Sequence, residues 1–450
     1  MSKSSSPSRL VRVQGPLALE ATTVLGSRVF GVGLSFIVQI LFARWAGPDQ
    51  YGAYSYAMAW VALLSTFSGM GLPQAIVRYI PEYYSAKKWG LLRGVTERSE
   101  SLILVMSCAV AALGIAIVVG RNAAFSTTLI NTSLILGFAL VPPRALLRLQ
   151  TEMCVARKQV RVAYLLPYLL RPLSMIAGGA ALVMWLDQSL TAPLAVLLAG
   201  APVLPIWYVQ RWTFRRALPA PFHRTPSRYA TGHWIRTALP MLLITGFLLL
   251  LGQTDLLMIG LMSDPEQVGL YKVATKTASL VLFPLFAVNA VTAPRFAEMY
   301  ANGDNSTLQR LASTAAHWTF WSSLIVSVIL ITSSGFLLGL FGASFYRAEP
   351  AMWILVVGQL ANAGAGAVGP LLLMTGYQQE SAKVYGACAL LNIILNAIGI
   401  YFLGILGAAI ATAVSTALWN GGLYWLVTTK LGVYPSVFDS FRSSTSASIR

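Results

Sequence analysis

Residues 46–57 read AGPDQYGAYSYA, and residues 263–274 read SDPEQVGLYKVA. Each stretch lies between two long apolar runs, and an offset of 217 residues aligns the two without gaps. Proline sets φ at a tight connection, glycine allows a close backbone approach, and tyrosine suits the membrane interface. The pattern predicts one structural turn that occurs twice, and two unrelated short turns are the alternative interpretation. The identical pairs are Pro48 and Pro265, Gln50 and Gln267, Gly52 and Gly269, and Tyr54 and Tyr271.

The composition around these turns is that of a membrane protein. Of the 450 residues, 56% are hydrophobic and only 10% are charged, whereas a soluble domain carries about 25% charged residues. The apolar residues fall in blocks of about 20, the length that a helix needs to cross about 30 Å of hydrocarbon. A β-barrel would show short alternating segments instead. The sequence therefore predicts an all-α integral membrane protein.

Twelve apolar blocks are long enough to be transmembrane helices, six in each half of the chain. The first six are Thr22–Ala43, Ala53–Val77, Ser101–Val119, Ala124–Val141, Val162–Leu186 and Leu190–Val209. The second six are Ala238–Met262, Val268–Ala293, Thr319–Leu340, Ala351–Met374, Val384–Leu403 and Gly407–Val427. An even number of helices per half gives both halves the same orientation, as in parallel transporter repeats.

This division predicts two lobes joined by a basic linker. The predicted parts are an N-terminal tail (1–21), an N-lobe (22–209), a linker (210–237), a C-lobe (238–427) and a C-terminal tail (428–450). Loops on one side of the membrane, together with both tails, hold 25 of the 32 lysines and arginines, and the opposite loops hold three. The positive-inside rule then places both termini in the cytosol, and we expect a multi-pass protein of the cytoplasmic membrane.

The charge and the polar residues exclude several classes of function. A net charge of +17 would suggest a nucleic-acid partner in a soluble protein, but these cations lie mostly in the loops that should be cytosolic. Cys108, Cys154 and Cys388 are isolated, so no metal or disulfide spacing is present. No paired carboxylates or activated nucleophile stand out, and the outer loops are short. We expect neither an enzyme nor a cofactor.

The first repeated turn belongs to a longer familiar pattern. The stretch ARWAGPDQYGAYSYAMAWVALLSTFSGMGLPQAIVRYIPEY resembles the opening of polysaccharide-repeat-unit flippases of the Wzx type. In these flippases an A-R-x-x-G-P-x-x-Y-G-x-Y pattern ends the first helix, and a GL segment leads to a basic inner end. The positions that match are Ala43, Arg44, Gly47, Pro48, Tyr51, Gly52, Tyr54, Gly71, Leu72 and Arg78. Residues 254–280, 293–304 and 403–418 are also similar, so the resemblance covers nearly the whole chain.

The resemblance implies a fold and a substrate. The family lies with the lipid II flippases and the MATE antiporters in the MOP superfamily. It implies two six-helix lobes around a central cavity that work by alternating access. The implied substrate is an oligosaccharide on a polyprenyl pyrophosphate lipid, moved from the cytosolic to the outer leaflet. The implied partners are this lipid-linked glycan, membrane lipids and other polysaccharide assembly proteins, with no nucleic acid.

Five charged residues fall within the predicted helices. They are Arg28, Arg171, Lys272, Lys276 and Asp255. Charges in a membrane tend to face a cavity or each other, so the four cations are candidates for binding an anionic pyrophosphate–sugar head group. For Arg171 the alternative is a structural tie to backbone carbonyls freed by two nearby prolines. For Arg28 and Lys272 the alternative is snorkelling to the interface. Asp255 is a candidate for an ion pair with Lys272 or Lys276, for a gate, or for a proton or cation coupling site.

A lipid-linked oligosaccharide flippase is therefore the leading hypothesis. A MATE-like cation-coupled antiporter for small molecules is the first alternative, although a cationic cavity disfavours it. A membrane enzyme or a non-catalytic component of glycan assembly is the second alternative.

Overall fold

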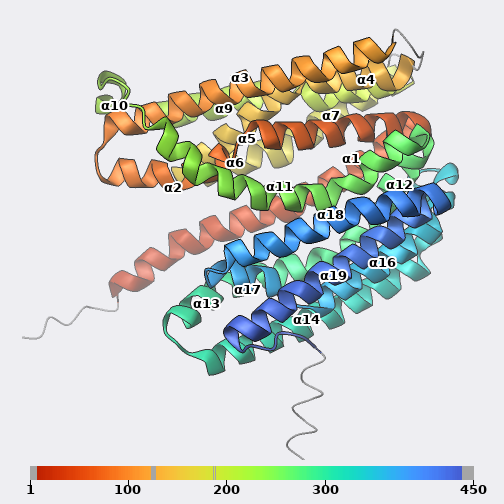
Figure 1. The fold of residues 1–450 in the computed structure, drawn as a ribbon. Helices are drawn as coiled ribbons and strands as arrows, with labels where there is room; N and C mark the ends of the chain where they lie inside the picture. Colours follow the sequence, from red (N-terminus) through yellow and green to blue (C-terminus); the bar gives the residue numbers. More distant parts are fainter. Residues whose placement is uncertain (1–7, 123–127, 186, 188, 438–450) are drawn as a thin grey trace, which may run out of the picture. The chain divides into compact units, whose positions relative to one another are not determined.

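The computed structural model describes residues 8–122, 128–185, 187 and 189–437 (Figure 1). The side chains of residues 8–29, 121, 122 and 128 lie outside this description. Every element of regular structure in the described ranges is helical. The predicted all-α membrane fold is confirmed.

Two compact units make up the chain. The first contains residues 1–46 and 60–242, and the second contains residues 47–59 and 243–450. The helices before the boundary are α1 (Ser8–Ser68), α2 (Leu72–Ser85), α3 (Trp89–Asn122), α4 (Thr128–Ala139), α5 (Val141–Ala156), α6 (Val160–Leu165), α7 (Arg171–Ala180), α8 (Ala192–Gly200), α9 (Val203–Arg216) and α10 (Ala220–Arg224). Helix α11 (Thr231–Met262) contains the boundary. The later helices are α12 (Pro265–Ala278), α13 (Phe283–Ala301), α14 (Asn305–Thr332), α15 (Ser334–Phe341), α16 (Glu349–Gly364), α17 (Val368–Met374), α18 (Gln378–Leu403) and α19 (Ile405–Leu431).

Ten helices in the described ranges are long and apolar enough to cross a membrane. The number becomes eleven if the bent pair of residues 343–364 and 368–374 counts as one span. The predicted total of twelve is not confirmed, because α1 counts once here and was expected to hold two spans. Residues Phe30–Ser68 alone number 39, which is about 58 Å of helix against about 30 Å of hydrocarbon.

Helix α1 consists of two helical segments that meet at Gly47. The backbone of Gly47 has φ 74° and ψ 171°, which is not helical. The second predicted span also ends earlier than expected, because the chain turns at Gly69–Gly71 before α2 begins. Gly71 has a φ of 73°, and a Cβ on it would lie 2.0 Å from the carbonyl oxygen of Ala238. Glycine is therefore required both for the turn and for this close approach.

The segment 47–59 packs within the second unit, against the second copy of the repeated turn. A Cβ on Gly52 would lie 1.7 Å from the carbonyl oxygen of Pro265 and 2.8 Å from the amide nitrogen of Gly269. A Cβ on Gly269 would lie 2.2 Å from the carbonyl oxygen of Pro48. The same two positions of each copy thus pack on the same two positions of the other. This reciprocity supports a true repeat over two unrelated turns.

In the first unit, α5 packs against α2, α3 and α9. One buried polar residue joins α9 to α5 and α6: Gln210 of α9 is fully buried. Its amide donates to the carbonyl oxygens of Val162 and Ala163 at 3.1 and 3.3 Å, and its side-chain oxygen accepts a bond from Thr151. A buried amide needs such partners, since an unpaired one costs about 1–3 kcal/mol.

The helical span that contains α5 is longer than the sequence predicted. The fourth span was expected to end at Val141, with residues 142–161 in a loop. Instead α4 and α5 form one apolar stretch over Leu129–Ala156. Pro142 and Pro143 follow the N-cap of α5, where a missing N–H costs nothing, so the helix continues. Arg144 and Arg148 therefore belong to a helix of this candidate span and not to a loop.

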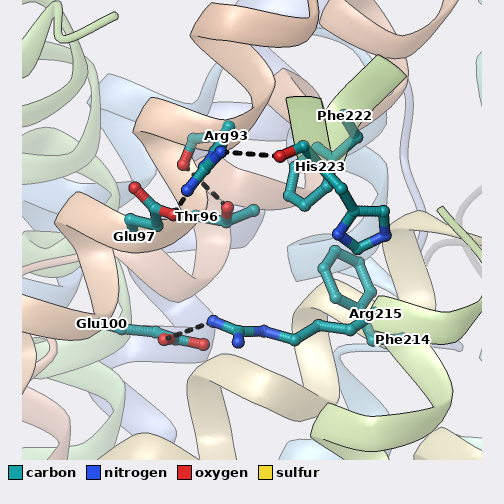
Figure 2. Close-up of a pocket in the computed structure, with 8 residues that line it drawn as sticks. All are labelled: Arg93, Thr96, Glu97, Glu100, Phe214, Arg215, Phe222 and His223. Atoms are coloured by element: carbon teal, nitrogen blue, oxygen red, sulfur yellow. Dashed lines mark hydrogen bonds and ion pairs between the residues drawn. The ribbon is translucent and has the colours of Figure 1, made fainter. Parts of the chain in front are cut away.

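Hydrogen bonds hold the segment after α9 against α3 (Figure 2). Arg93 donates to the carbonyl oxygens of His223 and Thr225 at 3.0 and 3.2 Å. Glu97 accepts hydrogen bonds from Arg93 at 2.8 Å and from Ser227 at 2.5 Å. The basic stretch predicted as a linker is thus bound to the first unit along this part of its length.

Candidate functional site

Asp255 is a buried carboxylate near the C-terminal end of α11, only 3% exposed. Its Oδ2 accepts a hydrogen bond from the Tyr271 hydroxyl at 2.6 Å and one from Thr412 at 3.3 Å. Its Oδ1 accepts a bond from the backbone N–H of Leu256 at 2.8 Å. The three side chains come from α11, α12 and α19, so the carboxylate joins three helices of the second unit. Three donors suffice to hold a buried carboxylate in place.

The two lysines of α12 make no ion pair with this carboxylate. Lys272 and Lys276 are one helical turn apart and half-buried. Within the described chain, neither ammonium lies within 4.0 Å of a carboxylate oxygen. The ion pair considered for Asp255 is therefore absent, because Tyr271 and Thr412 occupy the carboxylate instead. Tyr271 is the tyrosine of the repeated turn, so the turn itself supplies the partner.

Arg171 is the first residue of α7 and follows a π-helical turn at Leu166–Leu170. Pro167 lies within this turn and Pro172 follows Arg171 in α7, and π-turns are frequent at functional sites. The backbone carbonyl of Arg171 accepts a hydrogen bond from the Ser174 hydroxyl at 2.8 Å. The side chain of Arg171 is half-buried in the first unit. Arg28 belongs to α1, but its side chain lies outside the described residues.

Two further polar residues form buried hydrogen bonds and were not predicted from the sequence. Arg148 of α5 donates to the Thr66 hydroxyl at 2.5 Å in the first unit. Thr412 lies in a run of small residues on α19 that gives no sign of a carboxylate 157 residues away. A buried aspartate requires hydrogen-bond donors, which predicts that Asp255 has a partner. It does not predict which partner, because many hydroxyl side chains would satisfy the requirement.

The described residues offer no cluster of metal ligands. No group of three or more His, Cys, Asp or Glu there is arranged to hold a metal ion.

A family model described as "Polysaccharide biosynthesis protein" matches residues 19–300, more than half of the chain. The chain belongs to this family. A second model, MatE, matches residues 240–398. The polysaccharide biosynthesis match covers both copies of the repeated turn, as well as Asp255 and the two lysines of α12.

A relative that is similar in sequence over most of the chain supports this membership. The chain is 23% identical over 409 residues to a protein of Haloferax volcanii named "Probable low-salt glycan biosynthesis flippase Agl15". The alignment covers 89% of this chain and 81% of that protein.

Solved structures share the fold at low sequence identity. An inward-facing multidrug resistance MATE family transporter of the MOP superfamily matches with a TM-score of 0.71 at 13% identity, over 88% of this chain and 94% of that one. The lipid II flippase MurJ, in an inward closed conformation, matches with a TM-score of 0.70 at 14% identity, over 90% of this chain and 87% of that one. The chain therefore shares its fold with both kinds of transporter.

Proposed function

We propose that the protein is a transporter that flips a polyprenyl-pyrophosphate-linked oligosaccharide from the cytosolic to the outer leaflet. It works by alternating access and serves cell-surface polysaccharide biosynthesis. Membership of the polysaccharide biosynthesis family and the flippase named among its relatives support this reaction class. The name of this relative supports transport rather than catalysis.

The observation that carries the proposal is that the two lysines of α12 make no ion pair in the described chain. Lys272 and Lys276 are half-buried in a membrane helix, and the buried acid of α11 is engaged by Tyr271 and Thr412. A charge in hydrocarbon costs several kcal/mol unless it meets an opposite charge. A pyrophosphate supplies that opposite charge. Lys276, Lys272, Arg171 and Arg28 are the proposed contacts for the head group.

The second candidate function is a cation-coupled antiporter for small molecules. The MatE match over residues 240–398 favours it. A site for organic cations needs available carboxylates, however, and the hydrogen bonds to Asp255 leave its charge already stabilised. A non-catalytic role in glycan assembly is the third candidate, and no contact in the described residues favours it.

Asp255 is the proposed coupling residue. Its carboxylate sits between α11, α12 and α19, so a proton or cation bound there would change how the three helices are held together. The energy source would thereby act on the helix that bears Lys272 and Lys276.

The proposed location is the cytoplasmic membrane with both termini in the cytosol. The asymmetry of lysine and arginine supports this orientation. It persists when Arg144 and Arg148 are moved from a loop into the span Leu129–Ala156, since the opposite loops hold only three such residues.

The test is the leaflet on which the glycan lipid accumulates when the gene is deleted. Intact cells should hold polyprenyl-linked glycan that an added glycosidase cannot reach, and inverted membrane vesicles should expose it. The wild-type gene should restore surface polysaccharide, whereas Lys276→Ala should not. Lys276→Arg keeps the charge and should restore it in part. Lys430→Ala removes an exposed lysine at the end of α19 and is the matched control.

An unchanged distribution of glycan lipid together with altered drug efflux would overturn the proposal in favour of the antiporter. Normal glycan together with normal efflux would contradict all three candidates.

A further inference from the structure

One face of α9 presents a graded stripe of exposed side chains. Leu204, Tyr208 and Trp212 are 57%, 65% and 52% exposed, and Arg216 follows one turn later and is also exposed. Positions four residues apart share a helix face, so the stripe runs in the order apolar, aromatic, aromatic, cation. Its twelve-residue length is about 18 Å, slightly more than half of a bilayer core of about 30 Å. A phospholipid presents acyl chain, glycerol and phosphate in that same order.

The cationic end of the stripe opens into a hollow of about 360 Å³. Its lining consists of Tyr208, Arg211, Trp212, Arg215, Arg216 and His223. No acid is among these lining side chains. The hollow is therefore a basic and aromatic site at the end of a membrane helix.

An acid on the neighbouring helix α3 holds two arginines of this hollow in place. Glu100 of α3 accepts Arg211 at 2.5 Å and Arg215 at 3.9 Å. Figure 2 shows the Arg215 to Glu100 contact in the neighbouring hollow, whose lining includes Arg215 and His223 as well. The Arg216 guanidinium lies 5.0 Å from the centre of the Trp212 ring. Two of the three guanidinium groups thus share one carboxylate and the third lies over Trp212, which leaves an excess of positive charge at the hollow.

This arrangement matches the chemistry of a phosphodiester anchored in a bilayer. Arginine binds phosphate oxygens through paired N–H groups, and tryptophan and tyrosine favour the membrane interface. Basic pockets at the cytoplasmic ends of membrane helices attract anionic head groups. Free inorganic phosphate could bind the arginines, but it has no acyl chain that would contact Leu204 and Tyr208.

We propose that this hollow binds an anionic phospholipid, with its phosphate among Arg211, Arg215 and Arg216 and its acyl chain along Tyr208 and Leu204. The site lies wholly within the first unit and is separate from the lysines proposed to contact the transported substrate. It rests on the membrane-spanning fold and not on the identity of the glycan.

The test measures lipid binding to the purified full chain in non-ionic detergent by native mass spectrometry. Phosphatidylglycerol should bind more tightly than phosphatidylcholine of the same chain length. Arg216→Gln should weaken phosphatidylglycerol about fivefold, and Arg215→Gln together with Arg216→Gln about tenfold or more, because each basic residue adds to the attraction. Phosphatidylcholine binding should not change. Arg216→Lys keeps the charge and should lose less than Arg216→Gln.

The matched control is Arg310→Gln, which removes an exposed arginine of α14 outside the hollow. Equal phosphatidylglycerol binding by Arg216→Gln and Arg310→Gln would overturn the proposal. Full displacement of phosphatidylglycerol by millimolar inorganic phosphate would overturn it as well, in favour of a soluble anion. Gel filtration of each variant reports whether it is folded. Because binding is measured without transport, failure here is distinguishable from failure of the flippase proposal.

Discussion

Gly52 and Gly269 lie backbone against backbone, at equivalent positions of a turn that the chain contains twice. A Cβ on Gly52 would lie 2.8 Å from the Gly269 nitrogen, and one on Gly269 would lie 3.2 Å from the Gly52 nitrogen. The carbonyl oxygens of Pro265 and Pro48 lie closer still. Only glycine leaves room for this contact, so both copies of the turn need it for the same reason.

Gly52→Ala and Gly269→Ala should each force the two turns apart. Inserting a methyl group into so close a backbone contact costs about 1–3 kcal/mol. We expect a lower temperature of thermal unfolding in detergent for both variants. Gly252→Ala, on α11 of the same unit, is the matched control, because a Cβ there meets nothing within 4 Å. Equal stability of all three variants would contradict the close contact.

Tyr271→Phe should destabilise the second unit by removing the shortest hydrogen bond to Asp255. A buried carboxylate that loses a donor costs about 1–3 kcal/mol. Thr412→Val removes a longer bond of 3.3 Å and should cost less. Tyr401→Phe is the control, since that side chain is 76% exposed.

The double variant Tyr271→Phe with Thr412→Val separates the two bonds. Both donors serve the same carboxylate oxygen, so the two losses should not add. Thermal unfolding of the four proteins measures the coupling. Strict additivity would mean that the two donors act independently, contrary to the shared acceptor.

Glu97→Ala should release the segment that follows α9 from α3. The substitution removes the acceptor for both Arg93 and Ser227. Trypsin should then cleave faster after Arg224 or Arg228, two exposed sites in this segment. Glu380→Ala, on α18, is the control for loss of one negative charge. An unchanged cleavage rate in detergent would show that other contacts, such as the Arg228 N–H to the Gly90 carbonyl at 2.8 Å, hold the segment alone.

Asp304 should make the start of α14 sensitive to acid. Its carboxylate accepts hydrogen bonds from the Thr307 backbone and the Ser306 hydroxyl, each at 3.0 Å. Hydrogen bonding from Thr307, and then from Ser306, lowers the pKa of this aspartate. Because the folded pKa lies below the unfolded one, the stabilisation is complete above the ordinary value of 3.8 and is lost as pH falls through the folded value.

Asp304→Asn keeps a capping oxygen without a titrating charge. The difference in unfolding temperature between wild type and this variant, followed from pH 6 to pH 3, should shrink on acidification. A difference that is constant with pH would show that the charge contributes nothing.

The membrane class and most helices could be predicted from the sequence, because apolar length is a local property. A block of about 20 apolar residues predicts a span whatever it packs against. Boundaries were less predictable, since helix ends depend on neighbours. The span expected to end at Val141 continues to Ala156, and the one expected to reach Val77 is interrupted at Gly71, where Ala238 comes close.

The candidate site could be predicted only by residue type. Burial of Asp255 and the presence of Lys272 and Lys276 in a helix follow from their apolar surroundings in the chain. Which of them pair does not follow, because it depends on how α11, α12 and α19 are rotated against each other.

The sequence by itself determined that this is a helical membrane protein with a repeated turn and few intramembrane charges. Those properties depend on residues that are neighbours in the chain. The tertiary structure alone decided that Asp255 is held by Tyr271 and Thr412 rather than by a lysine. It also decided that the two copies of the turn pack on each other through Gly52 and Gly269. Both contacts join segments that are far apart in sequence. Which residues meet in them depends on how the helices pack, to within a few ångströms.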